Sequence, residues 1–144
     1  MTRTIVIPIM ALAVLGLGLG QTAQDPDCRP FAGPAITRRG GVIVQLGDGH
    51  YVARCVHFTE DHITGLELLQ RSGLDVACDG GAVCRIEYEG CDFPSEPCFC
   101  PCECTSSECR YWSYWHCLHG RWVYSGLGSA DWQIRNGDVD GWRW

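Results

Sequence analysis

The sequence lacks lysine altogether and has no run of basic residues. Its 11 basic side chains are all arginines and are outnumbered by 17 acidic residues, which gives a formal net charge of −6. Phosphate backbones and anionic lipid surfaces repel a chain of this charge. We therefore expect neither nucleic acid nor a membrane surface as its partner, and we look instead for a small molecule or another extracellular protein.

The sequence also lacks the short motifs that mark most enzymes. It has no Gly-x-Ser-x-Gly, Walker or His-Glu-x-x-His pattern, and its histidines and carboxylates are scattered. We therefore predict a protein that is not an enzyme, with no catalytic residue and no cofactor.

A third absence concerns cysteine spacing, because no Cys-x2-Cys pair occurs among the 11 cysteines. Zinc sites and thioredoxin-like redox sites usually need that spacing, since a tight turn brings the two sulfurs together. The stretch CFCPCEC at 98–104 instead has cysteines at alternate positions. Disulfides are favoured here, and metal binding through the cysteine-rich loop stays open as an alternative.

The first 20 residues, MTRTIVIPIMALAVLGLGLG, have the order of a secretory signal peptide. A short head with Arg3 precedes an apolar run, which ends in small residues. The run is shorter than a membrane-spanning helix needs. We predict a signal peptide at 1–20, a secreted or cell-surface location, and no membrane insertion once the signal is cleaved.

Export places all the cysteines in an oxidising compartment, where small domains are often stabilised by disulfides. Because the number of cysteines is odd, at least one is unpaired. Cys91 is expected to pair with Cys84 or with the loop, and Cys78 to pair with Cys117 if their strands are neighbours. The full set of candidate disulfide cysteines is Cys28, Cys55, Cys78, Cys84, Cys91, Cys98, Cys100, Cys102, Cys104, Cys109 and Cys117.

Turn signals divide the mature chain into an arm at 21–40 and one domain at 41–144. Hairpins are predicted at 41–58, 74–88 and 110–125, with glycine-containing turns, and a short helix is predicted within ITGLELLQRSG. Prolines make 90–109 a cysteine-rich loop. One helix packed on a mostly antiparallel sheet predicts an α+β domain, and a β-grasp-like arrangement suits this order of elements.

Four segments of the chain carry a resemblance to a known family. ITGLELLQRSGL, YWSYW, GRWVYSGLGSA and NGDVDGWRW together resemble the family of the C-terminal domain of transcobalamin and intrinsic factor, with its bacterial relatives, over roughly 42–144. The resemblance implies a β-grasp-like fold and the binding of a small molecule outside the cell. In the vertebrate proteins that ligand is cobalamin, so cobalamin or a related corrinoid is the ligand it implies here.

Aromatic residues are concentrated near the end of the chain. On a strand, Trp112, Tyr114 and His116 point to one face and Trp115 to the other. One face must pack in the core, and the other is either covered or available as a flat binding surface. The predicted ligand-binding residues are Trp112, Tyr114, Trp115, His116, Trp122, Gly128 and Trp132. The alternative is a structural or adhesive extracellular module that binds protein or glycan through the same aromatic surface.

Overall fold

The computed structural model describes residues 36–100 and 109–144. The predicted signal peptide, most of the predicted arm, and Cys28, Cys102 and Cys104 lie outside these residues. The elements, in chain order, are β1 (Arg38–Gln45), β2 (Tyr51–Phe58), β3 (Ile63–Thr64), α1 (Gly65–Gln70), β4 (Val76–Asp79), β5 (Ala82–Ile86), β6 (Glu89–Gly90), β7 (Ser113–Leu118), β8 (Arg121–Tyr124), β9 (Gln133–Ile134) and β10 (Val139–Arg143).

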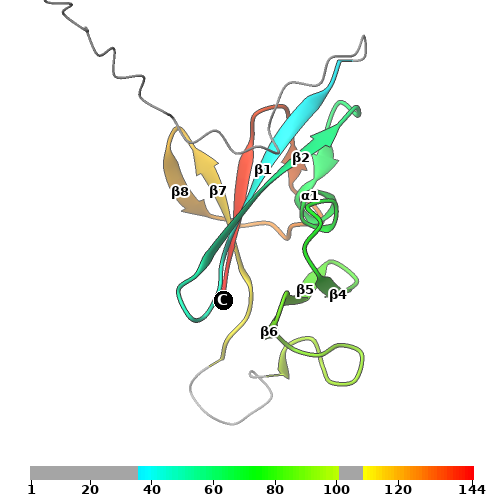
Figure 1. Ribbon diagram of the computed structural model, residues 1–144, viewed down its shortest axis with the longest axis vertical. Helices are drawn as coiled ribbons and strands as arrows, with labels where there is room; N and C mark the ends of the chain where they lie inside the picture. Colours follow the sequence, from blue (N-terminus) through cyan, green and yellow to red (C-terminus); the bar gives the residue numbers. More distant parts are fainter. Residues whose placement is uncertain (1–35, 101–108) are drawn as a thin grey trace, which may run out of the picture.

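A five-stranded sheet in the order β2-β1-β10-β7-β8 organises the domain. All its neighbours are antiparallel except β1 and β10, which run parallel although almost a hundred residues separate them in the chain. Strands β3 and β9 form a second sheet, and β4-β5-β6 a third. Figure 1 shows α1 and the β4-β5-β6 sheet on one side of the molecule, with β7 and β8 on the other.

The predicted α+β, β-grasp-like fold is wrong, because the described chain is mostly β and its sheet is mixed. Its single helix has only six residues. Thr64 begins the helix in a capping box with Glu67, as the sequence indicates, but the helix reaches its C-cap at Arg71. Gly73 follows with φ +78°, a conformation that glycine adopts readily. So short a helix covers only part of the sheet.

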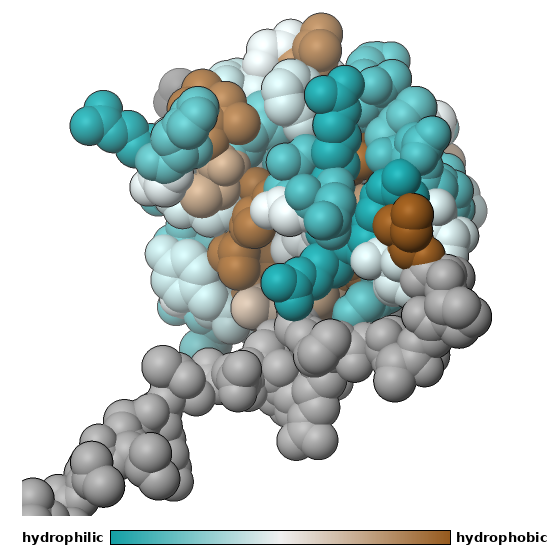
Figure 2. Space-filling model, turned by 90° about the horizontal axis from the view of Figure 1, so that it is seen from above, coloured by the Kyte–Doolittle hydropathy of each residue, from teal (hydrophilic) through white to brown (hydrophobic). Residues whose placement is uncertain are grey.

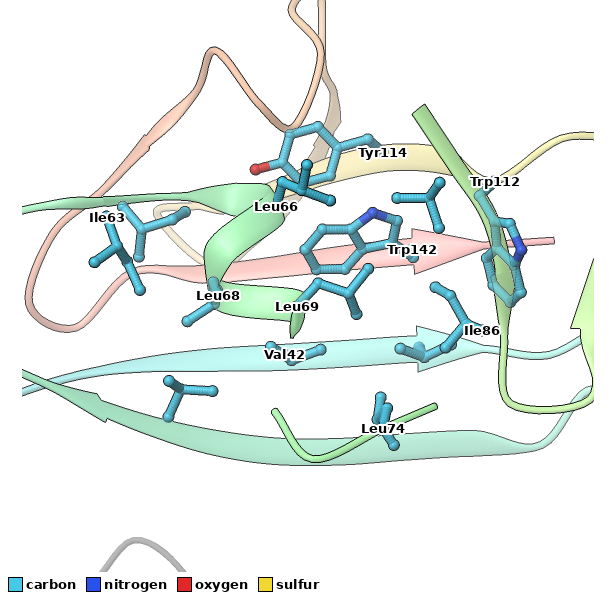
Figure 3. Close-up of a cluster of buried hydrophobic side chains, with 14 of the residues drawn as sticks. Val42, Ile63, Leu66, Leu68, Leu69, Leu74, Ile86, Trp112, Tyr114 and Trp142 are labelled. Atoms are coloured by element: carbon cyan, nitrogen blue, oxygen red, sulfur yellow. The ribbon is translucent and has the colours of Figure 1, made fainter. Parts of the chain in front are cut away.

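The core lies between α1 and one face of the five-stranded sheet, which we call the inner face. Figure 3 shows Leu66, Leu68 and Leu69 of α1 facing Val42 and Trp142. The helix comes close to the sheet because β1 has a glycine at position 40. A Cβ there would lie 2.7 Å from Leu68 Cδ1.

The described chain contains no helix long and apolar enough to cross a membrane. Figure 2 shows one end of the molecule, where hydrophobic residues lie in separate groups between hydrophilic ones. Among the residues coloured there, no large apolar surface is visible. The hollows described below lie elsewhere, on the faces of the five-stranded sheet.

Candidate functional site

Strand β7 divides its side chains between the two faces of the sheet. Tyr114 and His116 are buried on the inner face, whereas Ser113, Trp115 and Cys117 point to the outer face and are only partly buried. Trp112, just before β7, is also buried. The alternation predicted from the sequence is therefore confirmed, and it separates the aromatic residues into two groups.

The outer face has an aromatic centre around Trp115. In the strand register, Trp115 lies opposite Tyr124 of β8 on one side and Gly141 of β10 on the other. Its ring meets that of Tyr124 edge-on, with centroids 5.2 Å apart. The Nε1–H of Trp115 donates to Ser113 Oγ at 3.0 Å, which fixes the orientation of the indole.

Trp122 of β8 leans across the sheet over Gly141. A Cβ added to Gly141 would lie 2.8 Å from Cζ3 of Trp122, so the indole occupies space that any other residue at 141 would fill. Trp122 is nonetheless 47% exposed. The absence of a side chain at 141 thus lets an aromatic ring lie near the sheet backbone while one surface of that ring faces solvent.

These residues surround a hollow of about 200 Å³, which we call the outer groove. Its lining is largely apolar and is formed by Ile43, Gln45, Tyr51, Trp115, Trp122, Gly141, Trp142 and Arg143. Pockets for drug-sized ligands are about 300–1,000 Å³. The outer groove therefore has room for one small ring or for one part of a larger ligand.

Polar groups lie along one edge of the outer groove. Arg143 is opposite Ser113 of β7 and next to Gln45 of β1, all on the outer face. Ser113 Oγ donates to the backbone oxygen of Arg143 at 2.8 Å. Within 36–100 and 109–144, the side chains of Gln45 and Arg143 have no hydrogen bond to protein, so both are available to a ligand.

A second hollow of about 480 Å³ adjoins the outer groove, and we call it the end groove. It shares Trp115 and Arg143 with the outer groove and extends to Trp144 and Tyr111. Its lining is Gly47, Cys109, Arg110, Tyr111, Ser113, Trp115, Arg143 and Trp144. The two grooves together make a continuous path along the outer face.

The inner face holds a buried polar cluster of four side chains. His116 Nδ1 lies 3.0 Å from Asp140 Oδ1, and His116 Nε2 lies 2.7 Å from Ser125 Oγ. Tyr114 donates its hydroxyl to the other oxygen of Asp140. Burial is the main cause that raises the pKa of Asp140 and also that of Tyr114.

This cluster has the residue types of a nucleophilic triad, and its serine is buried among three contacts. Ser125 Oγ donates to the Leu127 carbonyl at 2.8 Å, accepts from the Leu127 N–H at 3.1 Å and lies 2.7 Å from His116 Nε2. The cluster therefore holds the loop after β8 against the sheet.

A third hollow, about 310 Å³, lies beside that loop, and we call it the inner groove. Its aromatic lining comes from Phe99, Tyr111, Trp112, Tyr114, Tyr124 and Trp142, and the rest of its lining from 81–83 and 125–129. It is more polar than the outer groove.

The seven predicted ligand-binding residues do not form one site. Trp115 and Trp122 share the outer groove, whereas Trp112, Tyr114 and Gly128 line the inner groove. His116 and Trp132 stack on each other with centroids 3.8 Å apart, and His116 is buried.

Sequence reasoning missed Gln45, Tyr51, Gly141 and Arg143 as groove residues. Alternation within 139–143 indicates that Gly141 and Arg143 share a face, but only the parallel pairing with β1 brings Gln45 beside them.

The cysteine pairing differs from one of the two expectations. Cys84 pairs with Cys98 and Cys91 with Cys100, so Cys91 does reach into the loop as predicted. Cys78 and Cys117 are free thiols, because β4 and β7 belong to different sheets. The described residues thus leave two cysteines unpaired, where the sequence required only one. Cys55 and Cys109 are also disulfide-bonded.

The disulfides bear on the metal alternative. Cys91, Cys98 and Cys100 cannot act as thiolate ligands while they are paired. In the part of the chain that the structure describes, no group of three His, Cys, Asp or Glu side chains is arranged to hold a metal ion.

Comparison with known proteins finds no family model that matches the chain and no curated protein that matches its sequence. The resemblance to the transcobalamin family therefore stays a prediction.

Proposed function

We propose that this chain is a secreted, non-enzymatic binding domain that takes a small ring-shaped ligand on its outer face, and that the ligand is a sugar ring. The observation that carries the proposal is the outer groove, where Trp122 lies over Gly141 beside Trp115. The disulfides are compatible with an extracellular protein.

Three features of the outer groove support a sugar as the ligand. Indole rings offer flat apolar surfaces against which the C–H face of a sugar packs. Gln45 and Arg143 stand at the groove edge as hydrogen-bonding groups for hydroxyls. The groove is also open, so a ring within a longer chain can enter it without being enclosed.

The ligand implied by the family resemblance, cobalamin, belongs in the same test. A corrinoid is far larger than a hollow of about 200 Å³. Only one part of it would contact Trp115 and Trp122, which makes a single sugar ring the better match. If the sugar belongs to a cell-surface glycan, the domain is an adhesive extracellular module, which is the alternative function that the sequence indicates.

The proposal is tested by calorimetric titration of the full-length secreted protein with a panel of neutral and acidic oligosaccharides and with cobalamin. We expect saturable binding of at least one oligosaccharide, and we expect Trp122→Ala to weaken it at least about tenfold, because aromatic anchors commonly carry such binding. Val123→Ala is the matched control, since Val123 is adjacent on β8, similarly exposed and directed to the other face. Equal binding by wild type and Trp122→Ala would contradict the proposed site.

A further inference from the structure

Building on the proposed function, we infer that the sugar carries a carboxylate and that Arg143 recognises it. The first observation is the charge distribution. The chain has more acidic than basic residues and a formal net charge of −6. Yet the described residues that line the outer and end grooves include Arg110 and Arg143 and no aspartate or glutamate.

The second observation is that no carboxylate of the described residues forms an ion pair with Arg143, which is one of several arginines without such a partner. Three others form ion pairs within 2.8 Å: Arg38 with Asp61, Arg71 with Glu60 and Arg85 with Asp75. The guanidinium of Arg143 is exposed and makes no ion pair or hydrogen bond with residues 36–100 or 109–144. Its charge is therefore directed to solvent or to a ligand.

The third observation is the position of Arg143 relative to the aromatic rings. Gly141 and Arg143 are two residues apart on the outer face of β10, a separation of about 7 Å along a strand. A ring that packs against Trp115 and Trp122 in the outer groove thus has one edge within reach of the long Arg143 side chain. The neighbouring amide of Gln45 is placed for a hydroxyl on the same edge.

Arginine is suited to this task because its planar guanidinium donates two parallel hydrogen bonds to one carboxylate. An exposed arginine in water gains little from a single weak ion pair. In the groove, packing of the ring on Trp115 holds the carboxylate in place, so the bidentate pair forms without ordering a free ligand. A uronic acid residue, in which a carboxylate is attached directly to the sugar ring, has this combination of groups.

One carboxylate lies near the far end of the path. Glu89 approaches Gly47, where an added Cβ would be 2.8 Å from Glu89 Oε2. Gly47 lines the end groove and not the outer groove. The uronate is therefore assigned to the outer groove, whose described lining contains Arg143 and no carboxylate.

The test compares oligouronates with their methyl esters, which keep the ring and its hydroxyls but remove the charge. The probes are trisaccharides of glucuronate, galacturonate and mannuronate, each titrated as acid and as ester into the full-length protein at low salt. We expect one acid to bind at least about tenfold more tightly than its ester, and this preference to decrease as salt is added.

Variants assign the preference to Arg143. Arg143→Gln is expected to bind acid and ester equally, at the affinity that the wild type has for the ester. Arg135→Gln is the control, because Arg135 is an exposed arginine outside both grooves. An acid preference that survives Arg143→Gln, or equal binding of acid and ester by the wild type, overturns this inference and leaves the sugar site standing. Failure of every saccharide to bind contradicts the proposed function itself.

Discussion

At the scale of single residues, the outer groove depends on a residue with no side chain. Gly141 has neighbours on both strands beside it, Ile43 and Trp115, and its bare Cα lets Trp122 approach the sheet. Hydrogen bonding of Trp115 to Ser113 then holds the second ring. The geometry of the groove therefore depends on the close approach of the Trp122 ring to the backbone at Gly141, in addition to the types of residue that line it.

The first prediction concerns Gly141→Ala. The new methyl group would lie 2.8 Å from the Trp122 ring, and because that ring is half exposed it should swing away at little cost to folding. We expect saccharide affinity to fall at least about tenfold and the urea midpoint to change little. Calorimetry and urea unfolding measure both. A variant that binds as the wild type does would show that the position of Trp122 over Gly141 is irrelevant.

The second prediction concerns Ser125→Ala, which removes the hydroxyl that joins His116 to Leu127. One buried and two partly buried hydrogen bonds are then lost, and we expect the free energy of unfolding to decrease by about 1–3 kcal/mol. Urea unfolding measures the loss, with Ser95→Ala in the exposed loop as the control.

The same serine should not react with a fluorophosphonate probe, because its side chain is buried and its oxygen is in contact with His116 and with the backbone of Leu127. Covalent labelling of Ser125, detected by mass spectrometry, would contradict the structural role and point to hydrolytic chemistry.

The third prediction is a pH dependence caused by Asp140. Burial raises the pKa of this carboxyl above its ordinary value of 3.8. At pH values between 3.8 and the pKa in the folded chain, the folded chain therefore binds more protons than the unfolded chain. The contribution of Asp140 to the free energy of unfolding should therefore decrease as the pH rises from about 3.8 through the folded pKa. The groups facing Asp140 are Tyr114, His116 and Asp138.

Asp140→Asn removes this titration and keeps a polar group of the same shape. Urea unfolding from pH 3.5 to 7 should show a shallower decrease with pH in the variant than in the wild type. Asp131→Asn, at an exposed carboxylate, should keep the wild-type slope. Identical slopes for wild type and Asp140→Asn would rule out the raised pKa of Asp140 as the cause.

At the scale of elements, local signals predicted the hairpins well and their assembly poorly. The turn of Gly47-Asp48-Gly49 separates β1 from β2, and His119-Gly120 separates β7 from β8, both as predicted. Turn residues act locally, which is why the sequence reveals them. The parallel pairing of β1 with β10 depends on contacts between the two ends of the domain, and no local pattern encodes it.

The helix is a second case in which a local signal was predicted and the assembly was not. Its capping box is confirmed, but a helix of six residues covers too little of the sheet to make the fold an α+β arrangement. Of the candidate site, sequence alternation predicted that Trp115 would face away from Trp112 and Tyr114. Alternation did not predict that Trp122 would lie beside Trp115 over Gly141, because these three residues belong to three different strands.

The fourth prediction concerns the disulfide between Cys84 and Cys98. It closes a loop of 14 residues at the end of β5, and replacing both cysteines with alanine should lower the free energy of unfolding by roughly 3 kcal/mol. Cys78→Ala removes a free thiol and is the control, with a smaller expected loss. Urea unfolding without reductant measures both, and an equal effect of the two changes would show that the disulfide adds nothing specific.

At the scale of the whole molecule, the domain separates its stabilising and binding functions onto the two faces of one sheet. The inner face carries the core and the buried Asp140 cluster, and the outer face carries the aromatic groove with Arg143 at its edge. The two faces share strands, so substitutions on the outer face can change binding while the core stays intact. This separation is what makes the binding predictions testable independently of folding.

The most direct test of the sugar site is nuclear magnetic resonance of the six tryptophan indole N–H groups during titration with the tightest-binding saccharide. We predict saturable shifts of the Trp115 and Trp122 signals with little change at Trp112 and Trp132, because only the first two line the outer groove. Assignment by single Trp→Phe variants identifies each signal. Shifts confined to Trp112 and Trp132, or saturable binding that moves neither Trp115 nor Trp122, would contradict the account.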